Sequence, residues 1–406
     1  MLTRRDFLRT SALAAAGVIP GTRLAGASFV LPQAYFGLHP FIESNPKAVF
    51  VRRTHVAHII DEEAKRREGL TLAREIFVPM ERPGIPVTHR IILKPNYAGT
   101  DVQFYEGVVM GLKEVGLREL YFVEANGYPY WVRRGFVAVN ERLGVQMNEP
   151  ERRIRHFREN WEMNWSTVPD GVVYKRIPHF TPVNEPDTWL LNIAKWRSHG
   201  MCLTLSVKNE QGLVVVPYTR FCPGWKMVTG VPDFMKPDIQ PNVEPVIRKF
   251  FERHVKAHYD RYDSQAELSP MHQEIWAHKT CDNMSTLKTG FAMIEAIYAL
   301  DGDGGEILTN LVMFSKDKFR LDVIGMYLGG HEPGDINLFR TAKERGLTDT
   351  FNPWEIPVYE WVDGAATPRK LTDFSRTPLK TYYLQQAGEP LYHLVNEPFD
   401  YDRYKI

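Results

Sequence analysis

The chain has 406 residues, of which 50 are basic and 49 acidic, so its formal net charge at pH 7 is only +1. This even balance argues against nucleic acid and an anionic membrane surface as partners. The length is enough for one large domain or two smaller ones.

The first 27 residues have the three parts of a secretory signal. Thr3-Arg4-Arg5-Asp6-Phe7-Leu8-Arg9 is charged, an apolar stretch follows over 11–19, and Ala25-Gly26-Ala27 is typical of a cleavage site. The paired arginines before Phe-Leu indicate export of the folded protein by the twin-arginine machinery. The apolar stretch has about half the length that a membrane span needs. We therefore expect a periplasmic or otherwise extracytoplasmic protein that begins near Ser28 and has no stable membrane span.

Strand and helix patterns alternate through the first part of the mature chain. Short β-branched and aromatic runs at 48–51, 89–93 and 120–123 predict strands. Apolar positions with helical spacing predict helices over 61–77 and 101–115, the second capped by Asp101 and ended by Gly116. The strand, helix and strand between 89 and 123 make a βαβ unit, which indicates a parallel sheet.

The second half of the chain is less regular. It predicts strands at 190–193, 202–207 and 311–314, and helices over 241–263, 287–299, 316–327 and 336–345. The last part is rich in proline and aromatic residues, and we expect 351–406 to wrap the surface as a C-terminal segment. Residues 28–350 then form a single α/β domain, with a mainly parallel sheet and helices on both faces.

The cofactor is not identified by any motif. Cys202, Cys222 and Cys281 are too few for a four-cysteine iron–sulfur cluster within one chain, and at most two of them can form a disulfide. The short motifs of dinucleotide, triphosphate, serine-hydrolase and zinc-protease sites are missing as well. A divalent metal remains a candidate cofactor.

Three strand ends carry polar side chains that a parallel sheet brings to one edge. They are Lys94-Pro95-Asn96, Glu124-Ala125-Asn126 and Lys208-Asn209, and His199 lies just before the strand that ends at the third. Ligands bind outside the carboxyl ends of strands in open α/β sheets, and a lysine there neutralises an anion or acts as a base. The catalytic candidates are Lys94 and Lys208, and the ligand-binding candidates are Asn96, Glu124, Asn126, His199 and Asn209. The alternative is that these residues belong to ordinary polar loops and share no ligand site.

Two acidic segments are candidates for holding a divalent metal. Asp301 and Asp303 belong to the loop Asp301-Gly302-Asp303-Gly304-Gly305-Glu306, where oxygen ligands on a flexible turn suit Ca²⁺ or Mg²⁺. A tight glycine turn is the alternative. Asp317 and Asp322 lie in the predicted helix at 316–327. Capping of that helix explains Asp317 equally well, and a buried polar contact explains Asp322.

An ordered set of motifs resembles a known family. The set comprises Lys94-Pro95-Asn96, Thr204-Leu205-Ser206-Val207-Lys208-Asn209-x-x-Gly212, Ser315-x-Asp317-x-x-x-x-Asp322 and Gly346-Leu347. Together these resemble the bacterial and archaeal family catalogued as domain of unknown function 362 (DUF362), over roughly residues 48–348. The resemblance implies an α/β domain with Lys94, Asn96, Lys208, Asn209, Asp317 and Asp322 at the family's motif positions. Some members carry iron–sulfur clusters in an added cysteine-rich module, which this chain lacks.

Two hypotheses for the function follow. The first is an enzyme or cofactor-handling protein of the cell envelope, in which Lys94, Lys208 and nearby carboxylates hold an anionic or metal-bound ligand. The second is a non-catalytic periplasmic protein that binds a ligand or assists assembly of another protein. Turnover of a substrate panel separates them, because a binding protein shows saturable binding without product.

Overall fold

A computed structural model describes residues 35–81, 84–125, 128–148, 163–199, 202–216, 218, 233–258, 270–302, 305–386, 389–391 and 399–402. The predicted signal at 1–27 lies outside the described residues, as do Asn126, Cys222 and Asp303.

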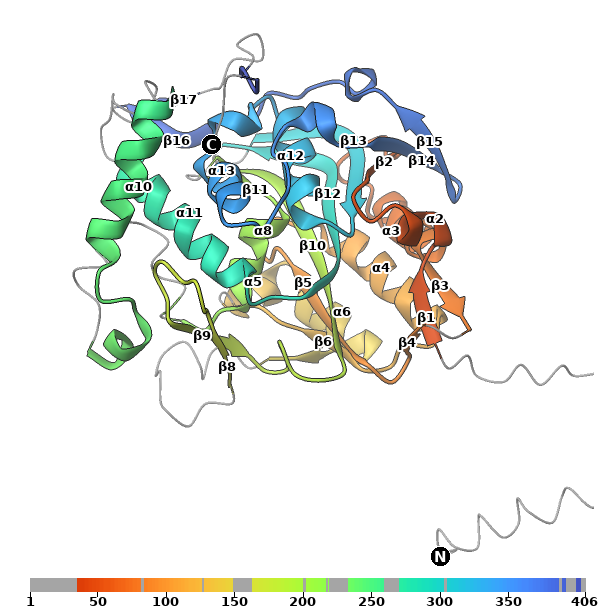
Figure 1. Ribbon diagram of the computed structural model, residues 1–406. Helices are drawn as coiled ribbons and strands as arrows, with labels where there is room; N and C mark the ends of the chain where they lie inside the picture. The colour runs from red at the N-terminus through yellow and green to blue at the C-terminus, as the bar shows by residue number, and fades with distance from the viewer. Residues whose placement is uncertain are drawn as a thin grey trace, which may run out of the picture.

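A ten-stranded sheet forms the centre of the molecule (Figure 1). Nine strands follow the order β15-β14-β2-β13-β12-β10-β5-β6-β7, and β11 pairs with β10. Their bounds are β2 Val49–Arg53, β5 Arg90–Pro95, β6 Leu120–Phe122, β7 Gln146–Met147, β10 Thr188–His199, β11 Cys202–Thr204, β12 Thr289–Asp301, β13 Gly305–Ser315, β14 Val358–Val362 and β15 Ala365–Arg369. The strands from β12 to β7 are parallel, whereas β13 and β15 run antiparallel to their neighbours. The predicted α/β class with a mainly parallel sheet is confirmed.

One face of the sheet is covered by helices from the first part of the chain. These are α2 (Pro40–Ser44), α3 (Glu62–Ile76), α4 (Val102–Glu114), α5 (Tyr128–Arg133) and α6 (Phe136–Leu143). Asp61 and Asp101 cap the first turns of α3 and α4 through their carboxylates. The two helices pack backbone against backbone, because a Cβ at Gly107 would lie 2.1 Å from the Arg66 carbonyl oxygen. Glycine is therefore needed where α3 and α4 cross.

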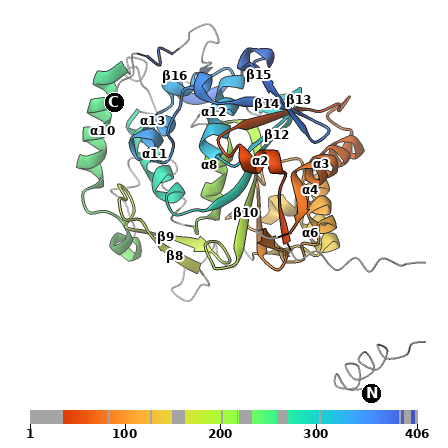
Figure 2. The same ribbon diagram turned by 45° about the vertical axis from the view of Figure 1, so that its right-hand side comes forward.

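The other face is covered by α8 (Ser206–Asn209), α11 (Pro270–Met284), α12 (Lys318–Leu328) and α13 (Asn337–Glu344), with α10 (Val243–His258) outside α11 (Figure 2). A 3₁₀ turn at Glu210–Leu213 continues α8. Every residue of α12 is buried. A helix enclosed on all sides has no polar face, which accounts for the mostly apolar sequence after Asp317. Helices on both faces agree with the prediction.

Smaller elements surround this sandwich. β1 (Tyr35–Leu38), β3 (Phe77–Met80) and β4 (Ile85–Pro86) form a three-stranded sheet. β8 (Met163–Thr167) pairs with β9 (Arg176–Phe180), and β16 (Thr381–Gln386) pairs with β17 (Glu389–Leu391). Among the described residues, the other 3₁₀ turns are Asp233–Asp238, Pro333–Asp335, Pro353–Glu355 and Leu371–Asp373. Within the described parts of the chain, no helix combines the length and the apolar character needed to cross a membrane.

Three segments differ from the sequence prediction. The strand predicted at 202–207 ends at Thr204 and Ser206–Asn209 form helix α8, so Lys208 and Asn209 lie in a helix rather than at a strand end. The helix predicted over 287–299 is wrong, because these residues enter β12, between β10 and β13. A continuous apolar run fits a helix and a strand covered on both faces equally, and here the sheet wins because 291–299 are all buried. Part of 351–406 also joins the sheet: β14 pairs with β2 and β15 pairs with β14. That part completes an edge of the sheet as well as lying at the surface.

Candidate functional site

Two polar residues face each other within the apolar interior of the sheet. Lys94 at the end of β5 lies beside Asn192 of β10 in the parallel ladder. Side chains alternate along a strand, and Leu93 packs in the core beside α4 while Ile92 packs in the core beside α8. Lys94 therefore points to the α8 side of the sheet.

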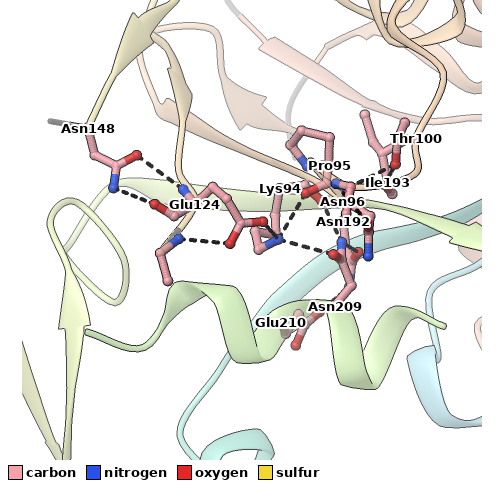
Figure 3. Close-up of polar contacts among 12 residues, drawn as sticks. Lys94, Pro95, Asn96, Thr100, Glu124, Asn148, Asn192, Ile193, Asn209 and Glu210 are labelled. Atoms are coloured by element: carbon pink, nitrogen blue, oxygen red, sulfur yellow. Dashed lines mark hydrogen bonds and ion pairs between the residues drawn. The ribbon is translucent and has the colours of Figure 1, made fainter. Parts of the chain in front are cut away.

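The ammonium of Lys94 is completely enclosed by acceptors (Figure 3). Its Nζ lies 2.6 Å from Glu124 Oε2, 2.9 Å from the Pro95 carbonyl oxygen and 3.1 Å from Asn209 Oδ1. The Lys94 and Glu124 side chains are only 1% and 4% exposed. An ammonium has three N–H groups, and all three are taken by these contacts. Lys94 thus joins the ends of β5 and β6 to helix α8.

Burial brings the two pKa values of this ion pair closer together. It lowers the pKa of Lys94 and raises the pKa of Glu124, while the opposite charge of each partner counteracts the effect. The proton between Nζ and Oε2 is therefore shared more evenly than it would be in water. Nζ has no N–H left to donate to a ligand.

Gly212 closes over the ion pair. A Cβ at this position would lie 2.2 Å from Glu124 Oε1 and 2.7 Å from Lys94 Cε. Both distances are shorter than van der Waals contact, so no larger residue fits without displacing the pair. Lys208, Asn209 and Gly212 are close in the sequence. Helix α8 and Gly212 therefore both pack on the Lys94–Glu124 pair.

A chain of buried amides continues from the ion pair into the protein. Asn209 Nδ2 donates to the Lys94 carbonyl oxygen and to Asn192 Oδ1, each at 2.8 Å. Asn192 Nδ2 donates to Glu210 Oε1 at 2.9 Å, and Lys318 Nζ lies 2.7 Å from Glu210 Oε2. Asn192 and Glu210 are fully buried. These contacts fix α8 and the turn after it against β5 and β10.

Asp322 of α12 holds the start of α8. Its carboxylate accepts hydrogen bonds from the backbone N–H groups of Ser206 and Val207, each at 2.8 Å, and from the Ser206 hydroxyl. Burial nevertheless raises the pKa of Asp322 to about 7, and the charge of Glu210 adds to the rise. The buried polar contact expected for Asp322 is therefore the N-terminus of α8.

Positive charge gathers around His199 at the end of β10. Burial lowers the pKa of His199 well below its usual value, and the charges of Lys208, Arg197 and Lys279 lower it further. Lys208 is half-buried on α8, and its charge also lowers the pKa of Glu124. His199 is therefore neutral at pH 7 and lies in a region of positive potential.

The loop after β5 is shaped by Asn96. Asn96 Oδ1 accepts from the Ala98 N–H at 3.1 Å, and its own N–H donates to Thr100 Oγ1 at 2.9 Å. Thr100 Oγ1 donates in turn to the Ile193 carbonyl oxygen at 2.8 Å (Figure 3). Asn96 thus stabilises the turn. Burial raises the pKa of the neighbouring Tyr97 to about 12, and the charge of Glu124 adds to the rise.

Of the acidic candidates for metal binding, Asp317 and Asp322 hold the starts of helices. Asp301 lies near the end of β10, where the N–H of Gly302 donates to Ser198 Oγ at 3.0 Å. Asp317 Oδ1 accepts from the N–H groups of Phe319 and Arg320, each at 3.0 Å, at the start of α12. Asp301 ends β12, and its Oδ1 accepts from the Lys380 N–H at 2.6 Å. Among the described residues, no group of three or more His, Cys, Asp and Glu side chains is placed to hold a metal ion. The metal roles of Asp301, Asp303, Asp317 and Asp322 stay predictions.

Sequence reasoning missed Asn192, Glu210 and Lys318. Asn192 is the polar residue in the apolar run Trp189-Leu-Leu-Asn192-Ile-Ala, which is a usable signal because a buried amide needs partners. Glu210 and Lys318 gave no comparable signal. They are 108 residues apart and are brought together by the packing of α12 against α8.

In comparisons with known proteins, no family model, curated protein or solved structure matches the chain. The resemblance to the DUF362 family stays a prediction based on the ordered motifs.

Proposed function

We propose that the carboxyl ends of β5, β6 and β10, together with α8, bind a small anionic ligand, and that the protein is an exported enzyme or cofactor-handling protein acting on that ligand. The observation that carries the proposal is the positive charge of Lys208, Arg197 and Lys279 around a largely buried His199. Positive charge in a region of low dielectric favours a carboxylate or phosphate group. Carboxyl ends of parallel strands are also where open α/β sheets bind ligands.

Each residue has a distinct role in this proposal. Lys208 binds the anionic group, and neutral His199 accepts a proton from the bound ligand. Lys94, Glu124 and Asn209 act as positioning residues, because their mutual contacts hold α8 and therefore Lys208 at the strand ends. A metal carried by the ligand itself would bind together with it, and no metal site on the protein is required.

Isothermal titration calorimetry with inorganic phosphate and with malonate tests the site. We expect Lys208→Ala to weaken binding of the preferred anion at least tenfold, because hydrogen bonds to charged groups contribute about 1.5–3 kcal/mol. Lys343→Ala is the matched control, since Lys343 is an exposed lysine on α13. Equal affinity of Lys208→Ala and the wild type for both anions would refute the assignment.

The titration of His199 provides an independent measurement. A bound anion adds negative charge near the imidazole, so the pKa of His199 should rise when the ligand binds. Proton NMR of the imidazole with and without phosphate measures this change. An unchanged His199 titration at saturating anion would place the ligand elsewhere.

A non-catalytic binding protein is the second candidate, and the enclosure of Lys94 favours it. All three N–H groups of the Lys94 ammonium are engaged by protein acceptors, so Lys94 does not reach a substrate as a base. The two candidates differ in turnover. Product formation that is lost in His199→Gln supports the enzyme, whereas saturable binding without product supports a binding protein.

Export by the twin-arginine route is tested separately. Replacing Arg4 and Arg5 by lysine keeps the charge of the signal but removes the arginine pair. We expect the variant to remain in the cytoplasm while the wild type reaches the extracytoplasmic fraction. Equal export of both would refute this route.

A further inference from the structure

A second polar region lies at the amino end of β10, away from His199. A cavity of about 480 Å³ is lined by residues of β5, β8, the connection from β9 to β10, the start of β10 and the segment before β12. Its walls include apolar Ile92 and Leu190, and its polar lining includes Ser166, Asn184 and Lys288. The anion-site residues Lys94, Lys208 and His199 do not line it. The cavity is therefore separate from the proposed anion site.

Ser166 contacts a buried histidine inside this region. His179 is fully buried, its Nδ1 lies 3.3 Å from Ser166 Oγ, and its Nε2 lies 2.9 Å from Asn283 Oδ1. Asn283 Nδ2 donates to the Glu210 carbonyl oxygen at 3.3 Å, which orients the amide so that its oxygen faces the imidazole. Nε2 must then carry the proton, because the carbonyl oxygen of an amide only accepts. Nδ1 is left as an acceptor, and two donors lie within reach of it, the Ser166 hydroxyl at 3.3 Å and Asn184 Nδ2 at 3.4 Å.

A side-chain amide is also placed beside the serine. Asn184 Nδ2 donates to Ser166 Oγ at 2.9 Å, and Asn184 lines the cavity. Its φ of 62° lies in the left-handed region, which asparagine tolerates better than most residues. When a hydroxyl adds to a carbonyl group, negative charge develops on the carbonyl oxygen. An amide donor next to the nucleophile is placed to stabilise that charge.

We propose that Ser166, His179 and Asn283 form a nucleophilic site that cleaves a short-chain carboxylic ester bound in the cavity. The Ser166 Oγ–carbon bond forms as Nδ1 of His179 takes the hydroxyl proton, and Asn184 Nδ2 donates to the carbonyl oxygen. The carbon–alkoxide bond then breaks, and the alkoxide leaves as an alcohol with that proton. Water next attacks the acyl group, its proton passes through Nδ1 back to Ser166 Oγ, and the carboxylic acid is released.

The surroundings of His179 make it a weak base in both halves of this reaction. Burial lowers the pKa of His179 to about 4, so the imidazole is neutral at pH 7 but accepts a proton only weakly. Asn283 is neutral and stabilises the imidazolium less than an aspartate would. We therefore expect slow turnover, in which acyl-serine accumulates from an ester with a good leaving group, because its acylation step needs less help from the base.

Covalent labelling of the full-length protein tests the proposal. A fluorophosphonate probe should modify Ser166 with a stoichiometry of one, located by peptide mass mapping, and p-nitrophenyl acetate should release a burst of about one equivalent of nitrophenol. Ser166→Ala should abolish the label, and His179→Gln should slow labelling at least tenfold. Thr167→Ala is the matched control, because Thr167 is an exposed hydroxyl on the opposite face of β8.

The outcomes separate cleanly. Modification of Ser166 that depends on His179 supports the proposal and does not involve the anion site. A wild-type protein that leaves Ser166 unlabelled while retaining its native circular dichroism spectrum overturns it. Labelling of Ser166 at the same rate in folded His179→Gln overturns the role of the histidine.

Discussion

Two buried lysine–glutamate pairs lie on opposite faces of the same sheet and differ in what surrounds them. In both, Nζ and Oε2 are 2.6 Å apart, and the side chains are at most 4% exposed. Lys94 has two further acceptors besides Glu124, and one of them belongs to α8. Lys195 has Glu295 and lies 3.2 Å from the centre of the Tyr298 ring.

The difference shows that two pairs of the same geometry serve different purposes. The Lys195 pair joins the central strands β10 and β12, and Glu295 Oε2 also accepts from the Asp101 N–H at the start of α4. It holds only elements of the core. The Lys94 pair holds α8, which carries Lys208 of the proposed site. We therefore expect the first pair to govern stability and the second to govern ligand binding.

The largest effect should come from removing one partner of the core pair. Lys195→Met leaves the Glu295 carboxylate buried without its cation, beside the negative charge of Asp101. Such uncompensated buried charges cost about 3–5 kcal/mol. Urea denaturation measures the loss, and Lys195→Met combined with Glu295→Leu should recover most of it. A loss below about 1 kcal/mol in the single variant would contradict the assignment.

The matching variant at the other pair distinguishes stability from function. Lys94→Met should also destabilise the protein, but it should in addition release α8 and weaken anion binding more than Lys195→Met does. Calorimetry on both variants, at a temperature where each is folded, makes the comparison. Equal anion affinity in the two variants would show that the pairs are equivalent.

The pH dependence of stability sharpens the comparison, because Asp322 fastens only α8. Its pKa of about 7 in the folded protein lies above the value of about 3.9 expected in the unfolded chain. The folded state therefore binds the proton more tightly, and this contribution to stability falls as pH rises from about 4 to about 7. Its size is at most roughly 3–4 kcal/mol.

Asp322→Asn removes this titration and tests it. The stability of the variant relative to the wild type should improve as pH rises from 5 to 8, although the variant loses a capping contact at every pH. Urea denaturation across this range measures the difference. If the difference in stability between the variant and the wild type stayed constant from pH 5 to 8, Asp322 would not titrate in this range.

Much of the fold was predictable from the sequence because it depends on local patterns. Asp101 caps α4 as predicted, and Asp317 has the capping role that was the alternative to metal binding. Strand β12 was mistaken for a helix because an apolar run carries no period that distinguishes the two. The sequence also grouped Lys94, Glu124 and Asn209, which do meet, although only Glu124 follows a strand: Lys94 lies at the end of β5 and Asn209 lies in helix α8. The links through Asn192 and Glu210 depend on long-range packing, which no local pattern records.

Each of the two lysine–glutamate pairs is covered by a glycine, and the two glycines differ in which atoms they approach. A Cβ at Gly99 would lie 2.7 Å from Lys195 Cγ and 2.9 Å from its Cβ, whereas a Cβ at Gly212 would meet Glu124 Oε1 and Lys94 Cε near the ends of their side chains. Atoms near a backbone cannot move aside as side-chain ends can. Overpacking typically lowers the free energy of unfolding by roughly 1–3 kcal/mol. We therefore expect a larger loss from Gly99→Ala than from Gly212→Ala. The reverse order in urea denaturation would contradict this reasoning.

The smallest effect is expected from Thr289, at the far end of the network from Lys94. Its hydroxyl donates to Glu210 Oε1 at 2.8 Å and accepts from Lys318 Nζ at 3.0 Å. Thr289→Val keeps the shape but removes one hydrogen-bond donor and one acceptor, which costs about 1–2 kcal/mol. Glu210 retains Asn192 and Lys318 as partners, so α8 should stay in place and anion affinity should be unchanged. Weakened binding in this variant would mean that the whole network, rather than the Lys94 pair alone, sets the position of Lys208.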